Sequence, residues 1–421
     1  MPFSHRLVSK CILPLPVFTK HRAGRNSGLP GLLVAGLSAL LLSAATAAAN
    51  TPCGGDFKAF LAGVKAEAVA DGVSAAVAER ALAQARLDKQ VISRDRGQGV
   101  FRQTFLEFSA RSVSSARLKH GANNMAKFVK VFERADKEFG VPAAVITAFW
   151  GLETDFGAVQ GDFNTFNALA TLAHDCRRPH LFRPQLIAAL HMIAHGDLDP
   201  ATTTGAWAGE IGQVQMLPDD IIRYGVDGDG DGHVNLKTSS PDAILTAAKF
   251  IVSLGWRKGE PWLIEVAVPA DLPWAETGLG REKTLADWTR LGVSSRGAKL
   301  PSQSLPASLI LPQGRKGPAF LVFPNFSIYL RWNQSFVYTT SAAYFATRLA
   351  GAPKLTPGAP ETGLSVDEMK ALQTKLAARG HNVGKVDGIL GSGTRQAVQA
   401  EQSRLGLPAD GWPTAALLGR L

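Results

Sequence analysis

The chain has 421 residues, of which 46% are hydrophobic and 19% charged, so it has room for two or three domains with a sizeable core. This composition is that of a globular protein and excludes a natively disordered chain. The net charge is +10, but removal of the first 49 residues leaves 40 basic against 35 acidic residues. No cluster of Lys and Arg indicates nucleic acid, and we expect no nucleic-acid partner.

Residues 1–49 are predicted to be a signal peptide. A basic region that ends at Arg25 precedes an apolar run at residues 29–42, and residues 47–49 are three alanines that offer a cleavage site before Asn50. The run is too short for a stable membrane span. We therefore expect export to the periplasm or cell envelope. An uncleaved anchor is the alternative, and a membrane partner is expected only in that case.

Cysteine usage fits an exported protein. Cys11 leaves with the signal, and Cys53 and Cys176 remain. Two cysteines in an oxidising compartment permit one disulfide, although the sequence does not show whether they lie close together.

The first predicted helices cover residues 56–86 and 125–139, where apolar residues share one helical face. A buried helix follows at residues 141–157, because its apolar residues fall on every side. Gly140 closes the preceding helix, Pro142 suits the first helical position, and Gly157 offers a stop.

Glu153 lies near the end of this apolar helix. Burial favours the neutral form of a carboxylic acid, and the negative end of a helix dipole disfavours the anion further. A protonated carboxyl group is what general acid catalysis requires. The alternative is a structural role, in which Glu153 pairs with an arginine or caps a backbone amide.

Two more helices are predicted at residues 163–173 and 182–194, followed by a loop rich in small residues at 205–218. Glycines in this loop would let the backbone approach a ligand closely. Gln213 and Gln215 carry donors and acceptors that suit sugar hydroxyl and acetamido groups, or they stabilise a tightly packed turn.

Residues 227–235 match the start of an EF-hand calcium loop. Asp227, Asp229 and Asp231 occupy loop positions 1, 3 and 5, with glycine at position 6. Thr238 stands at position 12 in place of the usual glutamate, and Asp242 is the nearest later carboxylate. The expected role is structural, and the alternative is a metal-free Asp/Gly turn.

A helix is predicted at residues 241–254, and short strands at 263–268 and 319–323 indicate a small β lobe inserted into a helical domain. A last helix runs to Leu349. Residues 351–363 are a Pro/Gly linker, and residues 364–421 form a compact unit of helices and Asp-Gly turns without acid/base candidates. This unit is expected to bind rather than catalyse.

These stretches together resemble the lytic murein transglycosylase B family, glycoside hydrolase family 103. The matching segments are residues 151–157, 164–173, 207–218, 227–236, 324–326 and 331–333. The tail is similar to the peptidoglycan-binding domain of the first type, although Glu401 stands where that family often has Phe. The resemblance implies a mainly α, lysozyme-like (α+β) catalytic domain over residues 50–350 with a small inserted β lobe, then the linker and a three-helix module at 364–421.

The resemblance also implies residue roles. Glu153 would be the single acid/base, Gln215 would line the site, and Asn333 and Tyr338 would hold Glu153 and the sugar. Ala206 stands where some members have Ser, and Trp332 replaces a Tyr, so a phenolic hydrogen bond is expected to be lost. The implied cation ligands are Asp227, Asp229, Asp231, the backbone of His233, and Asp242.

The expected function is non-hydrolytic cleavage of the β-1,4 bond between N-acetylmuramic acid and N-acetylglucosamine, giving 1,6-anhydromuramic acid ends. The expected partner is the peptidoglycan glycan strand, the chain is expected to be a monomer, and no cofactor is needed beyond a structural calcium ion. One rival is a hydrolytic muramidase that uses Asp155 or Glu210 as base. The other is a non-catalytic wall-binding scaffold.

Overall fold

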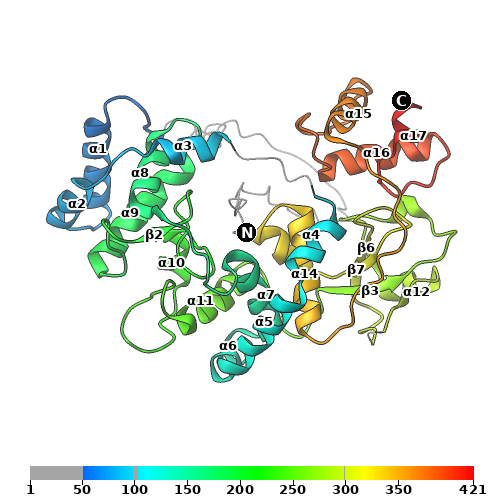
Figure 1. The fold of residues 1–421 in the computed structure, drawn as a ribbon, viewed down its shortest axis with the longest axis horizontal. Helices are drawn as coiled ribbons and strands as arrows, with labels where there is room; N and C mark the ends of the chain where they lie inside the picture. Colours follow the sequence, from blue (N-terminus) through cyan, green and yellow to red (C-terminus); the bar gives the residue numbers. More distant parts are fainter. Residues whose placement is uncertain (1–50, 98–102, 298) are drawn as a thin grey trace, which may run out of the picture.

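The computed structural model describes residues 51–97, 103–297 and 299–421 (Figure 1). The predicted signal at residues 1–49 lies outside the described residues. Across the ranges that are described, no helix combines the length and the apolar character needed to cross a membrane.

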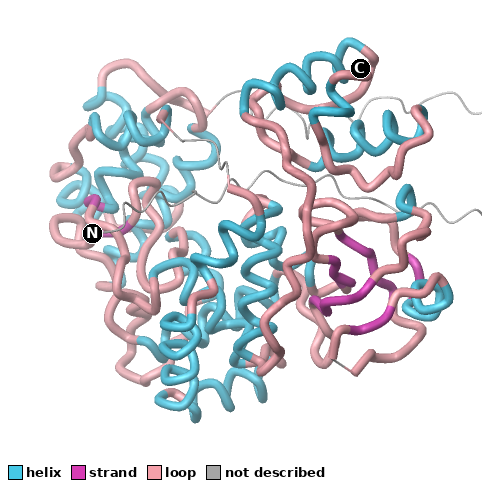
Figure 2. Tube along the Cα trace, turned by 45° about the vertical axis from the view of Figure 1, so that its right-hand side comes forward, coloured by secondary structure: helices cyan, strands magenta, loops and turns pink. Residues whose placement is uncertain are grey.

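Helices are the main regular structure of the described chain, and five of its strands gather in one lobe, while β1 and β2 form a separate two-stranded sheet among the helices (Figure 2). The helices are α1 (Phe57–Ala70), α2 (Ala75–Leu82), α3 (Lys89–Arg96), α4 (Phe105–Ser112), α5 (Ser115–Lys127), α6 (Val129–Phe139), α7 (Ala143–Thr154), α8 (Thr165–His174), α9 (Pro179–His195), α10 (Pro218–Tyr224), α11 (Ser240–Ser253), α12 (Leu285–Arg290), α13 (Phe326–Trp332), α14 (Phe336–Leu349), α15 (Val366–Ala378), α16 (Ser392–Arg404) and α17 (Ala415–Leu418), with the 3-10 turn η1 (Trp274–Glu276). The strands are β1 (Phe163–Asn164), β2 (Thr204–Gly205), β3 (Leu263–Ala267), β4 (Lys283–Thr284), β5 (Ser294–Ser295), β6 (Pro306–Ile310) and β7 (Ala319–Val322). The predicted fold class, a mainly helical domain with a small β lobe and a helical C-terminal module, is confirmed.

Two predicted helix boundaries are wrong, and each has a local cause. The helix expected over residues 56–86 is α1 and α2, because Gly72 adopts a positive φ of 100° and the Ser74 side chain caps a new helix. The helix expected over 125–139 spans the end of α5 and all of α6. The break falls at Phe128, which ends one helix and begins the next.

The sequence did not show whether Cys53 and Cys176 are bonded, and in the structure they form a disulfide. Cys53 and Cys176 are bonded across 123 residues, with their Cα atoms 5.3 Å apart. The amide of Gly54 also donates to the carbonyl of His174 at 2.8 Å. The start of the described chain is therefore fixed to the end of α8, next to α1.

The main hydrophobic core surrounds α7, which packs against α5, α6, α11 and α14. The β lobe lies beside these helices (Figures 1 and 2), and its antiparallel sheet has the strand order β4-β6-β7-β3-β5. One face of the sheet joins the main core through Ile310, Phe320 and Val322. The other face covers a separate core that contains Trp288, whose indole N–H donates to the carbonyl of Ala307 at 2.8 Å. The β lobe thus contributes side chains to the same hydrophobic core as α7.

The predicted linker at residues 351–363 contains no helix or strand among its residues, all of which are described. It lies against the rest of the chain at several points. The buried Leu355 donates its amide to the Tyr344 hydroxyl at 3.1 Å, and the amide of Ala359 donates to the carbonyl of Lys316 at 2.9 Å. The domain boundaries stay a prediction, but this segment is anchored rather than a free tether.

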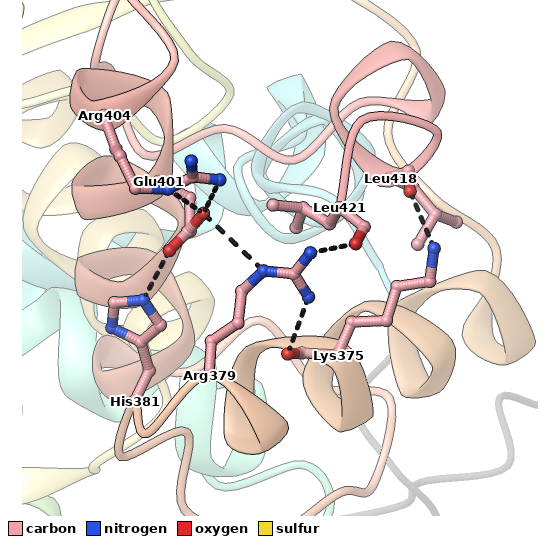
Figure 3. Close-up of polar contacts among 7 residues, drawn as sticks. All are labelled: Lys375, Arg379, His381, Glu401, Arg404, Leu418 and Leu421. Carbon is pink, nitrogen blue, oxygen red and sulfur yellow. Dashed lines mark hydrogen bonds and ion pairs between the residues drawn. The ribbon is translucent and has the colours of Figure 1, made fainter.

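Glu401 is buried inside the C-terminal module, where its relatives often have Phe. Its carboxylate pairs with Arg404 and with His381 at 2.7 and 2.8 Å, and Arg379 approaches it at 3.9 Å (Figure 3). The hydrogen bond from Arg404 is the largest cause that lowers the pKa of Glu401. Arg379 also donates to the carbonyl of Leu421. Arg379 thus connects the buried Glu401 carboxylate to Leu421.

The module is docked on the β lobe by buried polar contacts from α16. The Gln399 side-chain N–H group lies 2.9–3.1 Å from three carbonyl oxygens, those of Trp274, Thr277 and Ala409. Two of these carbonyls belong to the lobe and one to the module. Because buried carbonyls need donors, Gln399 links the two units at a position where water cannot substitute easily.

We therefore predict that Gln399→Ala lowers the free energy of unfolding by about 2–3 kcal/mol, since it leaves buried carbonyls without their donor. The measurement is the urea midpoint of the full chain. Gln396→Ala is the matched control, because Gln396 lies on the same helix and is exposed. Equal midpoints for the two variants would contradict this role for Gln399.

Candidate active site

Helix α7 places Glu153 in the protein interior. It begins at Ala143 after Pro142, which is the N-cap rather than the first helical residue, and it ends at Thr154. Asp155 then takes a left-handed conformation with φ of 52° and caps the helix. The stop therefore falls at Asp155, two residues before the stop predicted at Gly157. Only 8% of Glu153 is exposed, and this confirms the burial expected from the apolar sequence.

One oxygen of Glu153 accepts two hydrogen bonds from residues far along the chain. The Trp332 indole N–H donates to Oε1 at 2.6 Å, and the Tyr338 hydroxyl donates to the same atom at 2.7 Å. The sequence predicted that a phenolic hydrogen bond is lost at Trp332, and in the structure the indole N–H at this position donates to Glu153. The indole N–H supplies a donor to Glu153 where the sequence comparison anticipated a loss.

Aromatic packing fixes the two donors. The Phe149 ring, one turn before Glu153 on α7, stacks on Trp332 with the ring centroids 4.1 Å apart. Burial is the main cause that raises the pKa of Tyr338 well above its usual value, and the nearby Glu153 charge raises it further. Tyr338 therefore remains a protonated donor throughout the neutral range. The indole N–H does not titrate, so both donors are permanent.

Asn333 supports this arrangement without a hydrogen bond to Glu153 of its own. Its side-chain oxygen accepts from the Ser335 amide at 2.9 Å, and its carbonyl accepts from the Thr339 hydroxyl at 2.7 Å. These contacts set the turn between α13 and α14. Asn333 is thus placed to orient the helix that carries Tyr338, and a contact with the sugar stays a prediction.

The two glutamines predicted to bind substrate lie in the glycine-rich loop next to the end of α7. The Thr154 hydroxyl donates to the Gln213 carbonyl at 2.5 Å, and the Ser240 hydroxyl donates to the Gln213 side-chain oxygen at 3.2 Å. Gln215 has a positive φ of 51°, and its side-chain N–H group donates to the Gly212 carbonyl at 2.9 Å. Both are buried and hold the loop. Their contact with substrate is untested.

The rival carboxylates have other surroundings. Asp155 forms an ion pair with Arg117 at 3.0 Å. Glu210, the other rival base, is buried. Its carbonyl accepts from the Ala206 amide at 2.9 Å in a turn where Gly205 has no room for a Cβ atom. These observations favour structural roles for both residues.

The predicted calcium loop brings some of its expected ligands together. Carboxylate oxygens of Asp227, Asp229 and Asp242 lie within 4.8 Å of one another. Asp242 is fully buried and accepts from the amides of Gly228 and Asn235 at 2.8 and 2.7 Å. Asp231 lies outside this trio, and its Oδ1 accepts from the amide of His233 at 2.9 Å. Hard oxygen donors at this spacing fit a calcium ion.

Residues 56–347 match the model of the transglycosylase SLT domain family, and residues 365–421 match that of a peptidoglycan binding domain family. The chain belongs to the transglycosylase SLT domain family. The match covers more than half of the chain and includes every residue of the site just described. The family membership predicted from the motifs is confirmed.

Solved structures agree with this assignment. The chain is 36% identical to SltB3 from Pseudomonas aeruginosa in complex with NAG-anhNAM-pentapeptide, with a TM-score of 0.80 over 87% of this chain and 99% of that one. It is 26% identical to the Escherichia coli lytic transglycosylase Slt35 in complex with calcium, with a TM-score of 0.60 over 71% of this chain and 96% of that one.

A curated relative gives the same family with lower coverage. The chain is 29% identical over 237 residues to membrane-bound lytic murein transglycosylase B of Escherichia coli (strain K12). This match spans 56% of the chain and 64% of the relative. The chain therefore spans slightly less than two thirds of that transglycosylase.

For this transglycosylase-family chain we predict that Trp332→Phe lowers kcat by about tenfold to a hundredfold, because a hydrogen bond to an ionised group contributes about 1.5–3 kcal/mol. The phenyl ring keeps the stack on Phe149 but lacks the N–H donor. Activity is measured as release of soluble fragments from purified peptidoglycan.

Trp150→Phe is the matched control for this variant. Trp150 is a buried tryptophan of α7 itself, and its Nε1 has no hydrogen-bond partner within the described ranges. If the two variants lose activity equally, packing rather than the hydrogen bond to Glu153 explains the effect.

Proposed function

We propose that this chain is a lytic transglycosylase that cleaves the β-1,4 bond between N-acetylmuramic acid and N-acetylglucosamine without consuming water. The observation that carries the proposal is the double hydrogen bond of Trp332 and Tyr338 to one oxygen of the buried Glu153. It supports a single carboxyl group that works first as acid and then as base. The relative SltB3 was solved in complex with an anhydro-muramyl product, which favours the same outcome here.

The two donors determine which oxygen carries the proton. An indole nitrogen is only a donor, so Oε1 cannot hold a proton directed at Trp332. A hydroxyl group that already donates to Oε1 leaves that oxygen in the role of acceptor. The proton of the neutral acid therefore belongs on Oε2. This oxygen then donates to the glycosidic oxygen as the bond to C1 of the muramic acid breaks.

The same donors support the second half of the reaction. After proton transfer, the Glu153 carboxylate is stabilised by the Trp332 and Tyr338 hydrogen bonds, which need no rearrangement. It takes the proton from the C6 hydroxyl of the muramic acid, whose oxygen attacks C1 and closes the 1,6-anhydro ring. Glu153 ends protonated, as it began. The atoms balance without water.

The hydrolytic rival needs a second carboxylate that holds a water molecule. Asp155 is paired with Arg117, and Glu210 lies in a packed turn. These surroundings favour the cyclising reaction over hydrolysis. A non-catalytic scaffold does not require a buried carboxyl group at this position. Burying such a group costs stability that only its hydrogen bonds to Trp332 and Tyr338 offset.

We predict that Glu153→Gln lowers the rate of peptidoglycan cleavage by more than about a hundredfold, the scale of general acid–base catalysis. A glutamine keeps an oxygen that accepts from Trp332 and Tyr338, so the melting temperature should change little. Mass spectrometry of the wild-type digest should give muramic ends lighter than the hydrolysis product by one water molecule.

Asp155→Asn and Glu210→Gln are the controls that separate the rivals. Both should leave the anhydro product unchanged. A wild-type digest dominated by reducing ends, together with loss of activity in either control, would overturn the cyclising mechanism in favour of hydrolysis.

We also propose that the loop at Asp227, Asp229 and Asp242 holds a structural calcium ion, which the calcium complex of Slt35 supports. Asp231 and the His233 carbonyl are further proposed ligands. The ion would neutralise clustered carboxylates and stabilise the loop that precedes α11. No step of the reaction depends on it.

Calcium should raise the melting temperature of the chain relative to chelator, because a ligand that binds only the folded state stabilises it, by about 2.7 kcal/mol at a hundred times its Kd. The exposed ligand Asp229 is the residue to change, and Asp229→Asn should reduce this increase. Glu282→Gln removes an exposed acid of the β lobe and should not. If calcium has no effect on the wild-type chain, the loop is a metal-free turn.

The C-terminal module is proposed to bind peptidoglycan strands, as its family match suggests. A surface groove of about 550 Å³ is formed by the loop that connects α15 to α16 and by the start of α16, and its lining includes Asn382, Lys385, Asp387 and Gln396. Mixed charges and an amide suit a peptide or amino-sugar ligand. The Cys53–Cys176 disulfide supports export to the periplasm or envelope, where we propose that the chain acts as a monomer.

A further inference from the structure

Two histidines and an aspartate form a cluster where the end of α9 meets the predicted calcium loop. His195 is the last residue of α9, Asp197 follows two residues later, and His233 lies in the loop. His195 Nδ1 lies 2.9 Å from Asp197 Oδ2, and His233 Nδ1 lies 2.8 Å from Asp197 Oδ1. One ligand atom of each residue lies within 4.8 Å of the other two.

From this geometry we propose that His195, Asp197 and His233 bind a zinc ion through the two imidazole nitrogens and the carboxylate. Two ligand atoms about 2.0 Å from a tetrahedral zinc lie roughly 3.3 Å apart. The two histidine nitrogens face different oxygens of Asp197, at 2.9 and 2.8 Å, so an ion on one of these oxygens needs that contact to open by about half an ångström and the other ring to turn toward it; one ligand atom of each residue already lies within 4.8 Å of the others. A water molecule takes the fourth position.

The orientation of the rings is compatible with a shared ion. The centroids of His195 and His233 lie 5.7 Å apart, and the ring planes meet at 68°. Both rings direct Nδ1 toward the Asp197 carboxylate. In the tautomer that carries its proton on Nε2, each ring offers the lone pair of Nδ1 to an ion bound at this carboxylate. The histidine side chains are 64% and 51% exposed, which gives an incoming ion direct access.

The local electrostatic field favours a cation. The end of α9 presents the negative pole of the helix dipole. The carboxylate of Asp231, which accepts from the His233 amide at 2.9 Å, adds a further negative charge beside the cluster. Calcium would be attracted by the same field, but it prefers oxygen ligands, whereas imidazole nitrogen favours zinc and other first-row ions. Donor type therefore separates this cluster from the adjacent carboxylate trio, although His233 belongs to the same loop.

The ion would link two segments that are 36 residues apart in sequence. Gly196, between the two α9-side ligands, has a positive φ of 92° and ends the helix. This turn brings His195 and Asp197 to the same side of the helix end. A zinc ion here has a structural role, since it joins α9 to the loop and leaves the Glu153 chemistry unchanged.

The test is isothermal titration of zinc into the tag-free full chain at saturating calcium, so that the carboxylate trio does not compete. We expect one zinc per chain. His195→Gln and Asp197→Asn should each weaken binding by more than about tenfold, since loss of even an outer-shell partner costs that much. Cobalt bound in place of zinc should give the strong visible absorption of four-coordinate geometry, lost in the same variants.

His191→Gln is the matched control. His191 lies one turn earlier on α9 and pairs with Asp71, outside the cluster. It should bind zinc as the wild type does. His195 is exposed, so His195→Gln should remain folded, and circular dichroism checks this. If the wild type takes up no zinc, or if His195→Gln binds it equally well, the cluster is a hydrogen-bonded contact between α9 and the loop, and the proposal is wrong.

Discussion

The contact on which the site depends is the pair of hydrogen bonds to Oε1 of Glu153. A buried carboxyl group without donors costs several kcal/mol, so α7 can carry Glu153 only if α13 and α14 bring Trp332 and Tyr338 to it. The stack of Phe149 on Trp332 makes this approach favourable in its own right. Packing of the aromatic rings and pairing of the acid therefore stabilise the same arrangement of three helices.

The C-terminal module contacts both the segment after β6 and the start of α14 through Arg395. Arg395 of α16 is buried, donates to the Pro312 carbonyl at 2.8 Å, and lies over the Phe336 ring at 4.9 Å. Burial lowers the pKa of Arg395 to about 10, which still leaves the guanidinium charged at neutral pH. Phe336 begins α14, two residues before Tyr338. The C-terminal module thus contacts α14, the helix whose Tyr338 donates a hydrogen bond to Glu153.

The proposed metal sites lie outside the candidate active site, in the loop between α10 and α11 together with the start of α11 and the end of α9. Asp227, Asp229 and Asp242 offer oxygen, while the side chain of His233 turns toward Asp197 and offers nitrogen. Two adjacent clusters that differ in donor type can select different ions without competing for one position. The carboxylate trio lies close in sequence to Ser240, whose hydroxyl donates to the Gln213 side chain. The Gln213 carbonyl accepts from Thr154 at the end of α7, so an ion at the trio would help to fix the surroundings of that helix end.

The sequence by itself determined the family, the buried helix that carries Glu153, the β lobe, the three-helix module and the carboxylates of the calcium loop. These features are local, because periodicity, glycine positions and short motifs encode them within about 20 residues. Helix boundaries were less secure, since a single positive φ at Gly72 or Asp155 ends a helix that the apolar pattern would continue.

Only the tertiary structure decided which donors reach Glu153, that Cys53 meets Cys176, that Asp155 is paired with Arg117, and that two histidines share Asp197. Apart from the contact between His195 and Asp197, which lie two residues apart, each of these contacts joins residues at least 36 positions apart. The direction of a side chain across such a distance depends on how whole helices pack. The clearest case is Trp332, which in the sequence suggested a missing phenol and in the folded chain donates its indole N–H to the buried carboxyl group of Glu153.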